Sequence, residues 1–213
     1  MSLGWFGKVY KIRRKYDGRI LVWKEISYKK FSEKENKLLI TEVNVMRELK
    51  SWFIVKYIDR INIKEQHKMY IIMEYCEKGD LKQYIEKHKK DKAPIPEEFI
   101  WRILSQMWAA LEICHSSKNK VIHRDIKPGN IFIDKYDDVK LGDFGLSKKL
   151  AEDSIFAQTN VGTPYYMSPE QVSTSKYDEK TDIWSLGCIL YEMAALKVPF
   201  QACNYLKLAE VIR

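Results

Sequence analysis

The pattern of hydrophobic residues changes character near residue 77, and this change limits the folds that the chain can adopt. Before that point, four stretches are rich in β-branched and aromatic side chains, which favours strands over residues 8–13, 19–26, 54–61 and 69–75. A longer stretch, opened by Ser32, carries Leu39, Val43 and Met46 at helical spacing. The first third of the chain is therefore predicted to form a β-sheet with one amphipathic helix.

After that point the pattern becomes helical. Asp80 can cap a helix through His88, and a second helix is predicted from Pro96 through Leu111. Residues 183–196 form a strongly apolar helical run, which indicates a buried helix. The two parts together predict an α+β fold, with a small β-rich lobe, a larger and mainly α-helical lobe, and a ligand site between them.

The net charge of +8 admits a nucleic-acid-binding protein. However, the lysine-rich stretches 28–37 and 87–92 interleave acidic residues, as solvated surfaces usually do. Solvated surface is thus the first interpretation of these stretches, a surface that binds acidic protein partners is the second, and a nucleic-acid-binding surface is the last. No apolar run approaches the roughly 18 residues that a membrane span needs.

The four cysteines stand far apart, without the spacing of a metal site. Reduced thiols in an intracellular protein are therefore expected. These residues are Cys76, Cys114, Cys188 and Cys203.

The strongest signal is a set of three motifs in the second half of the chain. Residues 123–130 read His-Arg-Asp-Ile-Lys-Pro-Gly-Asn, residues 143–145 read Asp-Phe-Gly, and residues 168–170 read Ser-Pro-Glu. At this spacing the set resembles the protein kinase family. The resemblance covers essentially the whole chain. It implies a two-lobed protein-kinase-like fold, in which the helix after Ser32 is regulatory, and phosphoryl transfer from Mg-ATP.

The resemblance gives roles to the polar residues of these motifs. Asp125 is expected to accept or orient the hydroxyl proton of the substrate. Lys127 is expected beside the γ-phosphate, where a lysine is the Ser/Thr-kinase pattern. Asn130 and Asp143 are expected to hold Mg²⁺, because amide and carboxylate oxygens are hard ligands that suit this ion.

The first third supplies the matching parts. Lys24, which follows Leu-Val-Trp, resembles the lysine that contacts the α- and β-phosphates, and Glu42 is expected to pair with it. Residues 2–9 read Ser-Leu-Gly-Trp-Phe-Gly-Lys-Val and keep two of the three glycines of a phosphate-binding loop. Gly4 and Gly7 would let the backbone approach the phosphates, and Phe6 would cap the loop.

The adenine base is expected at residues 73–76, which resemble the hinge between the lobes. Met73 would be the gatekeeper, and backbone groups of Glu74 and Cys76 would hydrogen-bond the base. The apolar residues expected to enclose the ring are Val9, Val22 and Phe132.

Two further carboxylates match the family. Asp182 is expected to be buried and to hold the backbone of the catalytic loop, since a buried carboxylate needs donors. Glu170 is expected to be buried, with its usual arginine partner beyond the end of the chain.

For regulation, Arg124 would bind a phosphorylated loop, with Thr159 as the first candidate acceptor and Ser154 as the second.

Several stretches resemble the NIMA-related (Nek) branch, namely residues 21–26, 42–45, 141–146 and 161–171. This branch implies roles in the cell cycle, centrosomes, microtubules and cilia, in the cytoplasm or nucleus. One departure is at residues 51–53, which read Ser-Trp-Phe where the branch has His-Pro-Asn. Either the loop packs differently, or Trp52 and Phe53 form an apolar docking patch.

The chain is expected to be one partial kinase domain. Residues 1–76 would be an N-lobe incomplete at its start, and residues 77–213 a C-lobe incomplete at its end. Regions outside the chain could recruit an upstream kinase or a dimer partner. The alternative is a pseudokinase or scaffold, which binds partners without transfer. Lys24, Asp125, Asn130 and Asp143 are all present, which favours an active enzyme acting on protein Ser/Thr hydroxyls, without nucleic acid or membrane.

Overall fold

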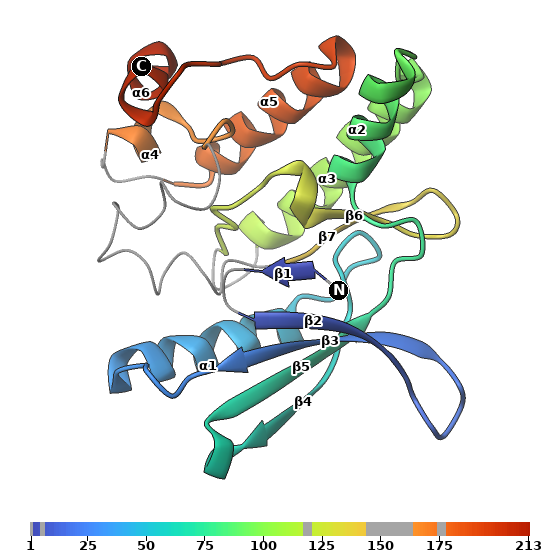
Figure 1. The fold of residues 1–213 in the computed structure, drawn as a ribbon, viewed down its shortest axis with the longest axis vertical. Helices are drawn as coiled ribbons and strands as arrows, with labels where there is room; N and C mark the ends of the chain where they lie inside the picture. The colour runs from blue at the N-terminus through green and yellow to red at the C-terminus, as the bar shows by residue number, and fades with distance from the viewer. Residues whose placement is uncertain (1, 5–6, 117–120, 144–163, 174–177) are drawn as a thin grey trace.

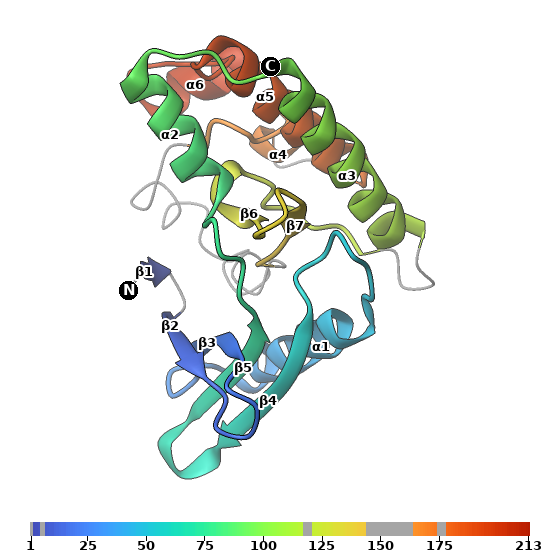
Figure 2. The ribbon, with the colours of Figure 1, turned by 90° about the vertical axis from the view of Figure 1, so that its right-hand side faces the viewer.

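A computed structural model describes residues 2–4, 7–116, 121–143, 164–173 and 178–213 of the chain. It has two lobes, with a strand-rich lobe around one helix and a lobe built mainly of helices (Figure 1). The predicted α+β architecture is confirmed. The chain passes from one lobe to the other through residues 75–80, between the last strand of the sheet and the first helix of the second lobe (Figure 2).

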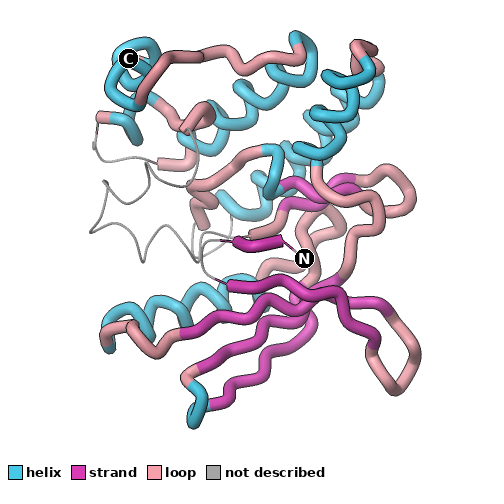
Figure 3. The backbone as a smooth tube through the Cα atoms, viewed as in Figure 1, coloured by secondary structure: helices cyan, strands magenta, loops and turns pink. Residues whose placement is uncertain are grey.

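The first lobe is built on an antiparallel sheet with the strand order β1-β2-β3-β5-β4 (Figure 3). Its strands are β1 (Ser2–Gly4), β2 (Gly7–Arg13), β3 (Ile20–Ser27), β4 (Tyr57–Ile63) and β5 (Lys68–Glu74). A short 3-10 turn, η1 (Lys64–Gln66), joins β4 to β5. Gly18, in the turn between β2 and β3, has a φ of 72°, which a glycine adopts without strain.

Helix α1 (Glu33–Glu48) begins with a capping box. The Glu35 amide donates to the Ser32 hydroxyl at 3.3 Å, and the Ser32 amide donates to the Glu35 carboxylate at 2.6 Å. These hydrogen bonds hold the pKa of Glu35 below its usual range. Leu39, Val43 and Met46 are buried on one face, as their helical spacing predicted.

The second lobe contains five α-helices, one 3-10 turn and a two-stranded sheet among the described residues. They are α2 (Leu81–Asp91), α3 (Glu97–Ser116), η2 (Pro128–Asn130), β6 (Ile131–Ile133), β7 (Val139–Leu141), α4 (Pro169–Val172), α5 (Lys180–Ala195) and α6 (Tyr205–Ile212). The predicted cap of α2 is confirmed, since the Asp80 carboxylate accepts from the Gln83 amide at 2.9 Å. The helix continues to Asp91, three residues further than predicted. The sequence analysis did not identify β6, β7 or α4, which are short.

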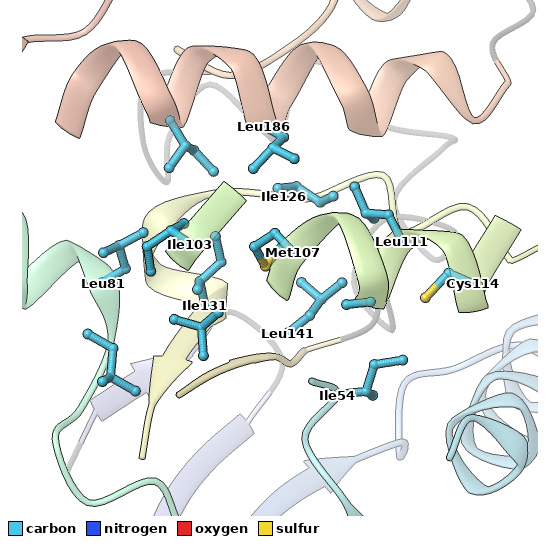
Figure 4. Close-up of a cluster of buried hydrophobic side chains, with 14 of the residues drawn as sticks. Ile54, Leu81, Ile103, Met107, Leu111, Cys114, Ile126, Ile131, Leu141 and Leu186 are labelled. Carbon is cyan, nitrogen blue, oxygen red and sulfur yellow. The ribbon is translucent and has the colours of Figure 1, made fainter. Parts of the chain in front are cut away.

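One hydrophobic cluster runs through both lobes. Its centre lies between α3 and α5, where Met107, Leu111 and Leu186 are almost fully buried (Figure 4). Leu141 of β7 and Ile54, from the link between α1 and β4, belong to the same cluster. The link thus contributes a fully buried side chain to the core that it shares with the helical lobe.

The prediction for the fourth strand was wrong at its start. A strand was expected from residue 54, but β4 begins at Tyr57. Residues 53–55 instead pair with β7, because the Leu141 amide donates to the Phe53 carbonyl and the Val55 amide donates to the Leu141 carbonyl, both at 2.8 Å. A strand-like sequence can satisfy its backbone with either sheet, and here burial of Ile54 selects the second one.

Candidate functional site

The irregular segment before η2 is held in place by one buried carboxylate. The Asp182 oxygens accept from the backbone amides of His123 and Arg124, both at 2.8 Å. The Nε2 atom of His115, in the last turn of α3, lies 2.8 Å from the same carboxylate. Burial would raise the pKa of Asp182, but these partners together hold it below its usual range. The expected anchor is confirmed, and Arg124 adopts a left-handed φ of 69° beside it.

Asp125, Lys127 and Asn130 form one hydrogen-bonded group directly after this anchor. The Lys127 ammonium donates to the Asp125 carboxylate at 2.7 Å. The Asn130 side-chain amide donates to the Asp125 carbonyl at 2.7 Å and to its carboxylate at 3.0 Å. Asn130 is buried by the turn of η2, so its amide plane has a defined orientation. The three residues that the motif predicted to act together are therefore in direct contact.

Asp143 is connected to this group through its neighbour Gly142. The Gly142 amide donates to the Asn130 carbonyl at 2.9 Å, and the Gly142 carbonyl lies 3.0 Å from the His123 Nε2 atom. Asp143 itself has a left-handed φ of 55°, which is rare outside glycine and is often found at functional sites.

Lys24 reaches across from β3 and forms an ion pair with Asp143. The Lys24 side chain is 8% exposed and that of Asp143 is 40% exposed, so the pair is open on the side of the carboxylate. Burial would raise the pKa of Asp143, but the Lys24 ammonium, together with His123 and Lys127, holds this pKa below its usual range. The Glu42 side chain, which was expected to pair with Lys24, lies outside the described part of the structure.

The strands place the other predicted residues around this ion pair. Val9 is the register partner of Lys24, and Val22 is the register partner of Met73. Gly4 and Gly7 face each other where β1 and β2 meet. Phe132 lies next to Gly142, at which an added Cβ atom would come within 2.8 Å of the Phe132 ring. The apolar residues expected around a base therefore lie on β2, β3 and β5 of the first lobe and on β6 of the second.

The hinge residues connect the sheet to the helical lobe. The Glu74 amide donates to the Lys56 carbonyl at 3.0 Å. Cys76 is buried, and burial raises the pKa of its thiol to about 12. All four cysteines of the chain are reduced thiols, as their spacing suggested, and only Cys203 is exposed.

One expectation about these residues was wrong, and others concern residues that the structure does not describe. Glu170 is only partly buried, and it accepts from the Thr181 hydroxyl at 2.8 Å, so a neutral donor already satisfies it. Phe6, Ser154 and Thr159 lie outside the described residues. The role of His115 was missed, because it belongs to no motif and meets Asp182 only in the folded chain.

The comparison with known families gives a match to the protein kinase domain over residues 2–212. The chain is 54% identical over 214 residues to "Probable serine/threonine-protein kinase nek2" of Dictyostelium discoideum, with all of this chain and 51% of that protein covered. It is 53% identical over 216 residues to "Serine/threonine-protein kinase Nek2" of Mus musculus, with all of this chain and 49% of that protein covered.

A more distant match has the same coverage of this chain. "G2-specific protein kinase nimA" of Emericella nidulans is 41% identical over 238 residues, covering all of this chain and 34% of that protein. The chain spans about half the length of the first curated relatives that it matches. Within the described residues, none of the helices combines the length and the apolar character that crossing a membrane requires. By motif, geometry and similarity alike, the chain belongs to the protein kinase domain family, in its NIMA-related Ser/Thr branch.

Proposed function

We propose that this chain carries the catalytic part of a Ser/Thr protein kinase, which transfers the γ-phosphoryl group of Mg-ATP to Ser or Thr hydroxyls of proteins. The observation that carries the proposal is the hydrogen-bonded group of Asp125, Lys127 and Asn130, joined through Gly142 to the Lys24–Asp143 ion pair. We divide the chain into an N-lobe of residues 1–76 and a C-lobe of residues 77–213, with the nucleotide between them.

The donor set fits a magnesium ion. The hydrogen bonds that the Asn130 side chain makes with described residues use its N–H₂ group, which leaves its oxygen Oδ1 for a metal. Asp143 adds a carboxylate that its lowered pKa keeps ionised at neutral pH. Within the described residues, no three acidic, histidine or cysteine side chains converge. Two protein ligands suit Mg²⁺, which commonly completes its shell with phosphate oxygens and water.

Each residue then has a task that its contacts support. Asp125, held by Asn130 and Lys127, would accept or orient the proton of the acceptor hydroxyl. Lys127 and Lys24 would neutralise negative charge on the nucleotide, which is the main requirement of phosphoryl transfer. Asn130 and Asp143 would hold the metal, with Glu42 presenting Lys24.

The rest of the nucleotide would be bound by groups from both lobes. Bound Mg-ATP would supply the transferable phosphoryl group and the metal that polarises it. The backbone at Glu74 and Cys76 would bind the base, below Met73. The residues proposed to surround the nucleotide are Gly4, Phe6, Gly7, Val9, Val22 and Phe132.

Removing either member of the Lys24–Asp143 pair should abolish transfer. Lys24→Met and Asp143→Asn in the intact protein should each lower kcat/KM for ATP by a factor on the order of 10² or more, because preorganised charge is lost. Radiolabelled transfer to casein measures this. Lys29→Met and Asp59→Asn, at exposed positions, are the matched controls and should retain activity. Near-normal transfer by either test variant would contradict the mechanism.

We also propose regulation by phosphorylation at Thr159, with Ser154 as the second candidate. A phosphate carries about −1.5 to −2 charge and pairs well with a guanidinium such as that of Arg124. Thr159→Ala should lower activity several-fold without lowering the melting temperature. Ser173→Ala, a control further along the chain, should not lower the activity. Mass spectrometry of active protein with Thr159 unmodified, and full activity of Thr159→Ala, would count against this site.

The names of the relatives suggest where such an activity is used. The Emericella relative is called G2-specific, so we propose a role in the cell cycle, with protein substrates in the cytoplasm or nucleus, including the centrosome. An upstream kinase or a dimer partner would act through regions outside this chain.

A further inference from the structure

The link between α1 and β4 is attached to the helical lobe immediately before Asp143. The Leu141 amide and carbonyl hydrogen-bond the Phe53 carbonyl and the Val55 amide, so the link forms a parallel bridge to β7 between Ile54 and Leu141. Ile54, between them, is 1% exposed and packs in the shared core (Figure 4). The position of this link therefore depends on the strand that leads to Asp143.

Lys140, on that same strand, is a buried lysine that the proposed phosphoryl transfer does not use. Its side chain is 8% exposed. The ammonium donates to the Trp52 carbonyl at 2.7 Å and lies 5.0 Å from the centre of the Trp52 ring. A buried ammonium is costly unless it is paired and hydrogen-bonded, so Lys140 needs these partners at its buried position.

The carboxylate that faces Lys140 belongs to the hinge. Glu74 Oε1 lies 3.6 Å from the Lys140 ammonium, and the Glu74 side chain is 16% exposed. The same oxygen accepts from the Lys56 amide at 2.6 Å, while the Glu74 amide donates to the Lys56 carbonyl. One carboxylate thus joins the hinge, the link and the strand before Asp143.

Trp52 is held against Lys140 from the other side. Its Nε1 atom donates to Asp138 at 3.4 Å, and Asp138 in turn accepts from Gln106 of α3 at 2.6 Å. Phe53 packs on the core, as the local-packing interpretation of the Ser-Trp-Phe sequence expects, whereas the Trp52 side chain is 64% exposed although it contacts Asp138 and Lys140. The indole covers the ammonium and gives it a favourable π-face.

We propose that Lys140 is a positioning residue that fixes the adenine-binding hinge relative to the metal-binding Asp143. Its ammonium holds the Glu74 carboxylate and the Trp52 carbonyl against β7, the strand that precedes Asp143. The base and the phosphates of one nucleotide are then bound at a set separation. This inference rests on the proposed function for its effect on transfer, whereas its effect on the link and on nucleotide binding does not depend on transfer.

The test compares Lys140→Met, Glu74→Gln and the double variant in the intact protein. Lys140→Met keeps the length of the side chain and removes its charge, and Glu74→Gln is the milder change should Lys140→Met fold poorly. Each single variant should weaken ATP binding about tenfold, the usual size of coupling between contacting groups, and the double variant should be little worse than either. Amide hydrogen exchange at Val55 and Leu141 should be faster in all three.

Lys135→Met is the matched control, because Lys135 is an exposed lysine on the turn between β6 and β7. It should leave ATP binding and hydrogen exchange unchanged. Unchanged ATP affinity and unchanged exchange in both single variants, or strictly additive losses in the double variant, would overturn the proposal. If the wild-type protein binds ATP but transfers no phosphate, the proposed function fails, while the binding and exchange results still decide the role of Lys140.

Discussion

At the scale of single residues, the buried charges of this protein each have identifiable partners. Asp182 is fully buried and is satisfied by two backbone amides and His115. Lys24 is buried against Asp143, and Lys140 against Glu74 and the Trp52 carbonyl. Such groups are costly to bury and very costly to leave unpaired, so each one specifies the position of the backbone around it.

Asp182 should make the stability of the protein sensitive to acid. Its folded pKa lies below the unfolded value of about 3.9, so its contribution is complete at neutral pH and is lost as the pH falls below about 4. Asp182→Asn should lower the unfolding free energy at pH 7 by about 2 kcal/mol and flatten the acid side of the stability curve. Urea unfolding between pH 3 and pH 7 measures both effects.

The control for this substitution is Glu112→Gln, at an exposed position of the same helix as His115. It should follow the wild-type curve throughout. An Asp182→Asn variant with an unchanged acid limb would show that this carboxylate is not the group that titrates.

At the scale of elements, the short sheet of β6 and β7 is packed closely against the link between α1 and β4. Gly142 follows β7, and a Cβ atom there would lie 2.8 Å from both the Phe132 ring and a Val55 methyl group. Both neighbours are themselves packed, Phe132 by β6 and Val55 by its hydrogen bond to Leu141. The absence of a side chain at Gly142 is what allows the link to lie against β6 and β7.

Gly142→Ala should therefore destabilise the protein by about 1–3 kcal/mol, the usual cost of overpacking. Thermal unfolding followed by circular dichroism measures the loss. Gly187→Ala is the matched control, because a Cβ atom at Gly187 meets nothing within 4 Å and the residue lies inside α5. There alanine should stabilise the helix by about 0.5–1 kcal/mol. A Gly142→Ala variant as stable as the wild type would show that Val55 and Phe132 can move apart.

At the scale of the whole molecule, the two lobes share one hydrophobic core. The cluster includes Ile26 and Val43 from the first lobe, Met107 and Ile189 from the second, and Ile54 from the link. Because the buried residues are continuous, the lobes should not unfold independently. Movement between them is then limited to what the link and the hinge allow.

Ile54→Ala should accordingly loosen both lobes together. The substitution leaves a cavity at a fully buried position and should cost about 2–5 kcal/mol. Hydrogen exchange should accelerate in β3 of the first lobe as well as in α3 of the second. Ile61→Ala is the control, because Ile61 is 45% exposed, and it should cost much less. Faster exchange confined to one lobe would contradict a shared core.

The features that could be predicted from the sequence are those whose causes are local. The capping box of Ser32, the cap at Asp80, the buried face of α1 and the turn at Gly18 depend on residues within a few positions of one another. The motif of residues 123–130 also brings Asp125, Lys127 and Asn130 together, since a single turn connects them. These features were predictable because propensity, capping and short-range hydrogen bonds act on neighbouring residues.

The contacts between distant segments could not be predicted, because they depend on how the whole chain packs. The start of β4, the pairing of the link with Leu141, the contact of His115 with Asp182 and the partners of Lys140 each join residues that are far apart in the chain. Local propensity does not distinguish the possible partners in these cases. The residues around Ile54, for example, are strand-like whichever sheet they pair with. In each case the observed arrangement buries the apolar side chain or pairs the buried charge concerned.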